Sequence, residues 1–165
     1  MSHAALHAAS RYVPAAGFAP ELEPPTPVQV REWVSDLFKQ DRITLAVALA
    51  EAGLALYPDS EDVLVIAALV AQVQQDWPHA RQLLEHLIAV QAGDSPAEVF
   101  CHLIRVLRCQ HDDAAAQARL AQALARHPND THLLALRQEL ACAADAPPGT
   151  EPANGRQNPG KKAGT

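Results

Sequence analysis

The sequence of 165 residues contains few aromatic side chains and few basic ones. Aromatic residues make up only 4%, and Ala and Leu supply much of the 48% that is hydrophobic. Such a composition favours helices, because Ala and Leu lose little conformational freedom when they enter one. The sequence has thirteen Lys and Arg residues and nineteen Asp and Glu residues, which gives a net charge of −6. This balance argues against a nucleic-acid-binding role, because phosphate recognition needs clustered basic residues.

Cysteines and long hydrophobic runs are also scarce. The three cysteines are Cys101, Cys109 and Cys142, and so sparse an odd set predicts no disulfide framework and favours a reducing, cytoplasmic compartment. The longest uninterrupted apolar stretch spans nine residues, 63–71, whereas a membrane-spanning helix needs about 20. The N-terminus also lacks a signal-peptide pattern. We therefore expect a cytoplasmic protein without stable membrane insertion.

The two ends of the chain differ from its middle. Residues 1–25 contain several prolines, and residues 146–165 contain four prolines and four glycines. Segments of this kind bury too little apolar surface to offset the entropy of ordering them. We predict disordered tails at 1–25 and 144–165 around a folded region at 26–143. A short apolar patch of Tyr12, Val13 and Phe18 is the part of the tails that could dock on a surface.

The middle of the chain has a helical pattern throughout and no stretch of strand-like alternation. The predicted helices span residues 27–40, 43–56, 61–74, 78–91, 96–109, 113–126 and 131–143. Because the turns between them are short, neighbouring helices must be antiparallel. The fold class is therefore all-α.

Several helices carry a start signal in the sequence. Thr26 precedes a proline and stands three residues before Gln29, and Ser95 stands in the same relation to Glu98. Both pairs predict capping boxes, in which the two side chains each bind a free backbone N–H of the first turn.

A helix-stop, turn and helix-start phrase occurs twice, as YPDSEDVL at 57–64 and HPNDTHLL at 127–134. Pro58 and Pro128 cannot continue the preceding helices. The distance between the phrases fits a 34-residue unit laid on 27–60, 61–94 and, after two extra residues, 97–130. Periods of this length are typical of helical solenoids.

The unit resembles the tetratricopeptide repeat (TPR). That family has a small residue at the twentieth position, where the two helices of a hairpin cross, and this chain has Ala46, Ala80 and Ala116 there. The resemblance implies a right-handed superhelical stack of three degenerate hairpins, with residues 131–143 as a capping helix. The chain departs from the family at Leu87, where the other two units have the small residues Gly53 and Ala123.

Motifs of catalysis and metal binding are not found. The sequence has no CxxC, no HExxH and no glycine-rich phosphate loop. Cys101 and Cys109 would lie about 12 Å apart along one helix, too far to share a zinc ion. The eight scattered histidines are interpreted as surface residues, and Trp33 and Trp77 as core residues. We predict no enzyme activity, no metal and no cofactor.

The resemblance implies that the first helix of each hairpin lines a concave groove. Helix 61–74 supports this, because it is apolar almost all round and needs cover on both sides. A neighbouring helix or the N-terminal tail is the alternative cover. The predicted groove residues are Arg31, Ser35, Phe38, Val65, Leu69, Gln72, Val73, Cys101, Arg105 and Arg108.

These features predict a module that binds a protein or peptide client. Its apolar anchors would lie on the middle of the groove, with an acidic or polar group at Arg105 and Arg108. The layout is similar to that of small TPR chaperones of type III secretion. Recognition of heat-shock chaperone tails is not expected, because Asp62 stands where that subgroup needs a cation. The alternative function is a scaffold subunit of a larger complex, and a homodimer is possible.

Overall fold

The computed structural model describes residues 23–144, which form seven α-helices joined by short turns. Every helix boundary lies within one residue of its predicted place, and the described residues contain no strand. The predicted tails fall almost entirely outside the described range. The helices are α1 (Pro27–Lys39), α2 (Ile43–Leu56), α3 (Glu61–Val73), α4 (Trp77–Val90), α5 (Ala97–Cys109), α6 (Asp113–Arg126) and α7 (Thr131–Ala144).

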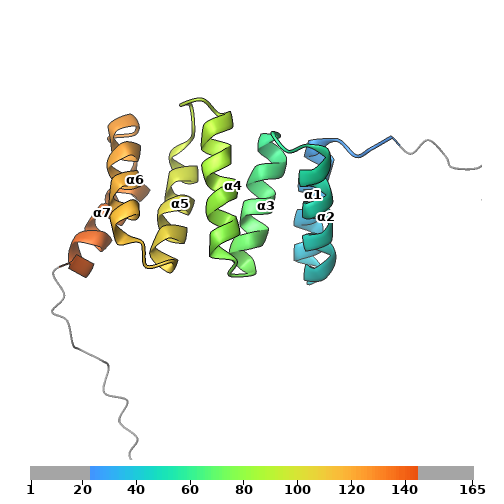
Figure 1. The fold of residues 1–165 in the computed structure, drawn as a ribbon, viewed down its shortest axis with the longest axis horizontal. Helices are drawn as coiled ribbons and strands as arrows, with labels where there is room; N and C mark the ends of the chain where they lie inside the picture. The colour runs from blue at the N-terminus through green and yellow to red at the C-terminus, as the bar shows by residue number, and fades with distance from the viewer. Residues whose placement is uncertain (1–22, 145–165) are drawn as a thin grey trace, which may run out of the picture.

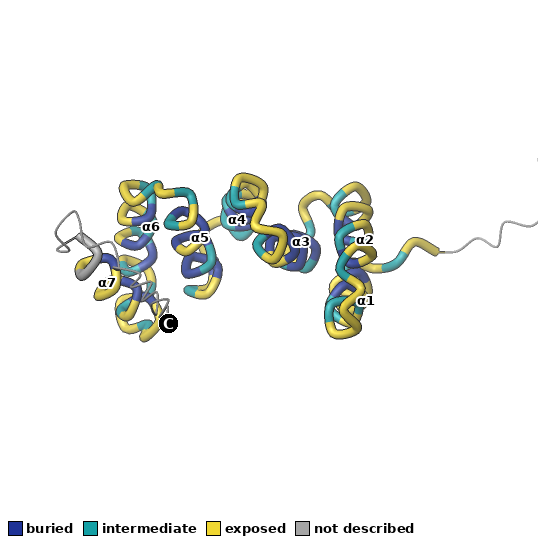
Figure 2. Tube along the Cα trace, turned by 90° about the horizontal axis from the view of Figure 1, so that it is seen from below, coloured by how far each residue is buried: buried dark blue, intermediate teal, exposed yellow. Residues whose placement is uncertain are grey.

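The helices stand side by side in chain order, from α1 and α2 at one end to α7 at the other (Figure 1). α1 packs on α2, α3 on α4, and α5 on α6, so the chain forms three hairpins. α2 and α4 each also pack on the first helix of the next hairpin, and α7 packs on both α5 and α6. Figure 2 shows the buried residues along the sides where neighbouring helices meet. The right-handed superhelical twist stays a prediction.

The first helix begins as the sequence predicts. The Thr26 hydroxyl accepts a hydrogen bond from the Gln29 backbone N–H at 3.3 Å, and the Gln29 side chain accepts one from the Thr26 N–H at 2.8 Å. Both halves of this capping box are therefore present. At the start of α7, the Asp130 carboxylate accepts hydrogen bonds from the N–H groups of His132 and Leu133.

The prediction of a second capping box at Ser95 is wrong. Pro96 keeps an extended conformation, with ψ at 152°, and α5 begins one residue later without a side-chain cap. Ser95 is fully buried, and its carbonyl accepts a hydrogen bond from Nε2 of His127 at 2.9 Å. Its hydroxyl has no hydrogen-bond partner among the described residues. Ser95 therefore does not cap the first turn of α5, and its carbonyl binds His127 instead.

The hairpin crossings follow the sequence prediction. Ala46, Ala80 and Ala116 are each 0% exposed, as close approach of two helices requires. The interpretation of Trp33 as a core residue is wrong, because 47% of its surface is exposed. Trp77, by contrast, is half-buried and packs against the core.

The connection between α4 and α5 is the irregular one. It runs from residue 91 to 96, six residues, whereas residues 57–60 and 127–130 join α2 to α3 and α6 to α7 with four. It accommodates Ala92 at φ 49° and Gly93 at φ 108°, a value that favours glycine. The two extra residues lie where the 34-residue spacing of the units is broken. None of the described helices is long and apolar enough to cross a bilayer.

Candidate functional site: a groove over α1, α3 and α5

The groove begins as a hollow between α1 and α3. Its volume is about 540 Å³. Leu69 and Val73 of α3 lie 37% and 60% exposed in its wall. Its lining residues are Ser35, Phe38, Ile66, Leu69, Gln72 and Val73. Apolar side chains therefore line most of the hollow and remain in contact with solvent.

A second hollow of about 270 Å³ lies between α3 and α5. Leu84 and Leu87 of α4 contribute to its lining, so the hollow extends between α3 and α5 as far as α4. Val65 and Ala68 line it on the α3 side, and Val99 on the α5 side. The hollow therefore separates α3 from α5 at this place in the stack.

Polar groups surround this second hollow. Nδ1 of His102 on α5 lies 3.1 Å from Oε1 of Gln72 on α3, a hydrogen bond that spans the gap. The Gln91 side chain donates to Glu61 at 2.8 Å, while its own Oε1 is buried and lacks a partner among the described residues. Burial, followed by the charge of Arg105, lowers the pKa of His102 below its ordinary value of 6.5. The ring is therefore favoured in its neutral form.

A third hollow of about 200 Å³ continues along α5 to His132 on α7. Leu69 and Gln72 line both the first and the second hollow, and Glu98 and His102 line both the second and the third. These shared walls join the three hollows into one groove, which we call the concave groove. Only its α5 end is lined by charged side chains.

The three predicted arginines take different positions. Arg31 forms an ion pair with Asp62 of α3, and Arg108 forms one with Glu139 of α7 at 2.9 Å. These two bridge neighbouring first helices at the sides of the groove and do not line its hollows. Arg105 is exposed and lines the third hollow. Since the other two charges are paired, Arg105 is the predicted cation best placed to meet a ligand.

The other predicted groove residues all line one of the three hollows. Cys101 does so while only 5% exposed. Burial raises the pKa of its thiol, so the group behaves as a small apolar side chain rather than a nucleophile. The sequence reasoning missed Gln91 and His132, which come from a turn and from α7. Helix periodicity carried no signal for either one, because their place depends on how the hairpins pack.

Ion pairs connect neighbouring hairpins on the side of the stack opposite the concave groove. Arg81 of α4 forms ion pairs with Glu85 at 3.3 Å and with Asp112, the residue before α6, at 3.0 Å. Glu85 also pairs with Arg119 of α6 at 3.4 Å. Arg81 and Glu85 are half-buried between two hairpins.

No three His, Cys, Asp or Glu side chains of the described region are grouped so that they could hold a metal ion. Cys101 is buried and Cys109 is exposed on the same helix. The groove therefore presents apolar surface, hydrogen-bonding groups, and the exposed side chains of Arg105 and Glu98.

Comparison with known proteins identifies the fold. The chain is similar to the first TPR of Spaghetti (RPAP3) bound to the HSP90 peptide SRMEEVD, with a TM-score of 0.63 and 12% identity over 73% of this chain and 94% of that one. It is also similar to the N-terminal domain of stress-induced protein-1 from C. elegans, with a TM-score of 0.60 and 16% identity over 70% and 94%.

A third solved structure, YrrB, is a TPR protein with an unusual peptide-binding site; the TM-score is 0.55, with 19% identity over 66% of this chain and 55% of that one. No family model matches the sequence, and no curated protein matches it either. The helical stack thus has the fold of TPR domains, as the repeat pattern predicts, at sequence identities of 12–19%.

Proposed function

We propose that this protein is a non-enzymatic interaction module that holds an apolar segment of a partner protein in the concave groove. The observation that carries the proposal is that Leu69 and Val73 are exposed to solvent inside the concave groove. The rest of α3 is largely buried against α1, α2 and α4. A helix with apolar residues on both sides is stable in water when something covers the second side as well.

The partner segment is proposed to be apolar over most of its length. Arg31 and Arg108 are already paired with acidic residues, so little free positive charge is left to attract an acidic peptide. Arg105 is exposed near the α5 end. One polar or acidic group of the partner would meet it there, while apolar anchors occupy the first two hollows.

The solved structures support a peptide ligand in general terms. The RPAP3 domain was solved with an HSP90 peptide, and YrrB is described as having a peptide-binding site. None of the matches named above is a secretion chaperone, so the narrower role expected from the layout has no support from them. The cytoplasmic location rests on the sparse cysteines alone.

Selection from a displayed library of random peptides tests the proposal. We expect enriched peptides with two or more apolar anchors, and we expect Leu69→Asp to abolish their binding, because it places a charge in the wall shared by two hollows. Leu45→Asp is the matched control. Leu45 is a similarly exposed leucine, at 45%, on α2 away from the groove, and this variant should bind as the parent does.

The peptide SRMEEVD serves as the negative probe, because the paired arginines leave no clamp for its carboxylates. Equal binding of the selected peptides by the parent and Leu69→Asp would overturn the groove proposal. A scaffold would instead lose its partners when the opposite side is altered, for example by Arg81→Ala. There the charged residues already pair with one another, so we favour the groove.

A further inference from the structure

The second helix of the first hairpin has an apolar side that is largely exposed in the described structure. Its core side holds Ala46, Ala50 and Gly53. An adjoining side carries a stripe at helical spacing, which we call the α2 outer face: Leu45, Ala48, Leu49, Ala52 and Leu56, of which Leu49 packs partly against the core. Leu45 and Leu56 are 45% and 52% exposed. α2 is thus apolar on two sides, and one of them is largely uncovered.

The other two hairpins provide an internal control. The residues that take the same places in the repeat unit on α4 are His79, Gln82, Leu83, His86 and Val90. Those on α6 are Ala115, Ala118, Arg119, Gln122 and Arg126. Both sets include polar or charged residues, although they face the preceding hairpin there: Leu83 is 7% exposed, and Arg119 pairs with Glu85 of α4. The wholly apolar outer face is therefore particular to the first hairpin and is not a demand of the fold.

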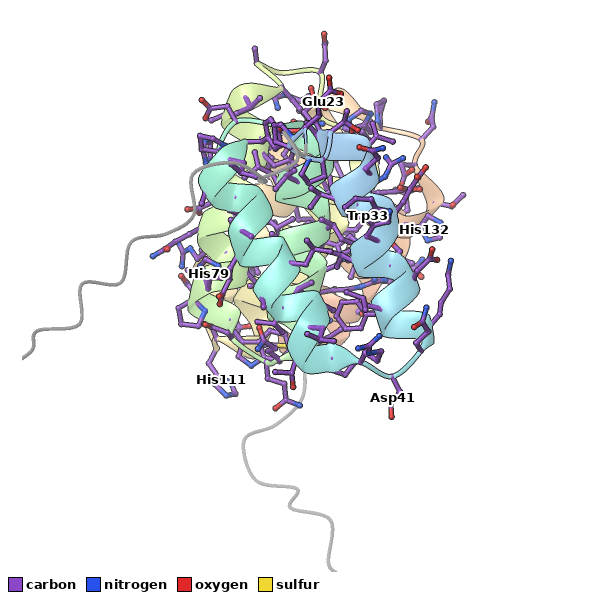
Figure 3. All side chains as sticks on the ribbon, turned by 90° about the vertical axis from the view of Figure 1, so that its right-hand side faces the viewer. Glu23, Trp33, Asp41, His79, His111 and His132 are labelled. Atoms are coloured by element: carbon purple, nitrogen blue, oxygen red, sulfur yellow. The ribbon has the colours of Figure 1, made fainter. Side chains whose placement is uncertain are left out.

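Trp33 extends the same surface onto α1. The residues at its place in the second and third units are Ala67 and Leu103, which are 4% and 0% exposed. Each of those lies on a helix that packs against the preceding hairpin, whereas α1 has no hairpin before it in the described chain. Figure 3 looks onto this end of the stack and shows Trp33 on its outer side, with α1 and α2 in front. Trp33 and the α2 outer face together form what we call the end face.

The chain carries a segment whose pattern matches this surface. Residues 3–13 repeat with a helical period and end at Pro14. One side of that period is polar, with His3, His7, Ser10 and Arg11. The other side is apolar, with Ala5, Leu6, Ala9, Tyr12 and Val13. An isolated helix of this length is marginal in water and needs a surface to pack on.

The tether between this segment and α1 is long enough. Residues 14–26 can span about 45 Å when extended, while α1 with its 13 residues is about 20 Å long. The segment can therefore reach every part of the end face. A tether of this length gives an effective concentration on the order of 1 mM. A free affinity of about 0.1 mM would then keep the segment docked about ten to one.

We propose that segment 3–13 docks on the end face through its apolar residues, in the place that a preceding hairpin would occupy. Leu6 and Tyr12 contact Trp33 and the α2 outer face, and the polar side faces solvent. The first hairpin thereby gains the cover that α2 and α4 give to the hairpins that follow them. This site is independent of the concave groove.

Fluorescence of Trp33 in the full chain tests this proposal. The chain has two tryptophans, so Trp77→Phe leaves Trp33 as the sole emitter, and circular dichroism confirms that this background is folded. We expect blue-shifted emission and weak quenching by acrylamide. Leu6→Asp should shift the emission to the red and raise the quenching constant several-fold, because a carboxylate cannot enter the apolar face. Ser10→Asp, on the polar side of the same segment, is the matched control and should change neither.

The solvent exposure of Trp33 can still be measured if Trp77→Phe unfolds the chain. Labelling the parent with 5-fluorotryptophan gives two ¹⁹F resonances, assigned through Trp33→Phe, and solvent exposure is read from the shift in heavy water. Trp33 that is equally accessible in the parent and in Leu6→Asp overturns the proposal. Protection that survives Leu6→Asp and grows with protein concentration also overturns it, and identifies a second copy of the chain as the cover. Groove binding measured on the same variants should be unchanged.

Discussion

The two junctions between successive hairpins are built from the same repeat unit but pack differently. At the first junction, Gly53 of α2 leaves so little room that an added Cβ would lie 2.7 Å from Val30 and 3.3 Å from Val63. At the second, the same position of the unit holds Leu87, fully buried, beside a hollow of about 270 Å³. The first junction is tight and the second is open.

Two features account for this difference. The side chain of Leu87 occupies space at a position where Gly53 and Ala123 let helices approach closely. The connection from α4 to α5 is also two residues longer than its counterparts, which allows α5 to stand away from α3. The residue that departs from the family pattern thus lines the second hollow of the candidate site. Three predictions test this comparison, from the largest effect to the smallest.

Gly53→Leu should disrupt the tight junction. The new side chain would have to displace Val30 and Val63, and overpacking of this kind typically costs about 1–3 kcal/mol. Removal of a mid-helix glycine returns up to about 1 kcal/mol, so we expect a net loss of about 1–2 kcal/mol in urea unfolding. Adding Val30→Ala should recover part of the loss by making room. A variant as stable as the parent would show that the first junction is not tight.

Ser95→Ala should stabilise the open junction. The Ser95 hydroxyl is buried without a partner among the described residues, and an unsatisfied buried group costs about 1–3 kcal/mol. We expect a gain of about 1 kcal/mol in the free energy of unfolding, measured with urea. A helix cap would give the opposite sign, since its loss costs about 1 kcal/mol. A destabilised Ser95→Ala would therefore restore the capping interpretation.

His102→Gln should reduce the acid sensitivity of the open junction. The pKa of His102 lies below its ordinary value of 6.5, mainly through burial. The unfolded chain therefore binds a proton more readily, and the stability from neutral His102 is lost as the pH falls below about 6.5. Glu98 and Arg105 face the ring with opposite charges, and Gln72 binds it. We expect the drop in melting temperature between pH 7.5 and 5.5 to be smaller in the variant.

The seven other histidines are present in both proteins, so the difference between the two pH profiles isolates His102. If the melting temperatures of the parent and His102→Gln fall equally with pH, the His102 ring does not contribute to the stability of the second junction. His111→Gln, on an exposed turn residue, is the matched control and should follow the parent.

The helices and their order were predictable because local chemistry decides them. The prolines at 58 and 128, the capping box at Thr26 and the alanines at the crossings act within a turn or between two helices of one hairpin. The candidate groove was predicted in part. Leu69 and Val73 follow from the periodicity of α3, whereas the ion pairs of Arg31 and Arg108 depend on neighbouring hairpins.

Trp33 and Ser95 show where sequence reasoning is insufficient. A tryptophan on the core side of a helical pattern is buried only if another element covers it. A serine before a proline caps a helix only if no stronger contact holds its backbone, and His127, 32 residues away, provides such a contact. Both errors concern partners that are distant in the sequence.

The sequence by itself determined an all-helical chain with seven helices at known places, because helix formation and termination depend on residues within a few positions of each other. The tertiary structure alone decided which junction is open, which arginines are neutralised and which apolar side chains stay in water. These properties depend on distances of a few ångströms between hairpins, which the bulk of Leu87 and the length of one turn set together.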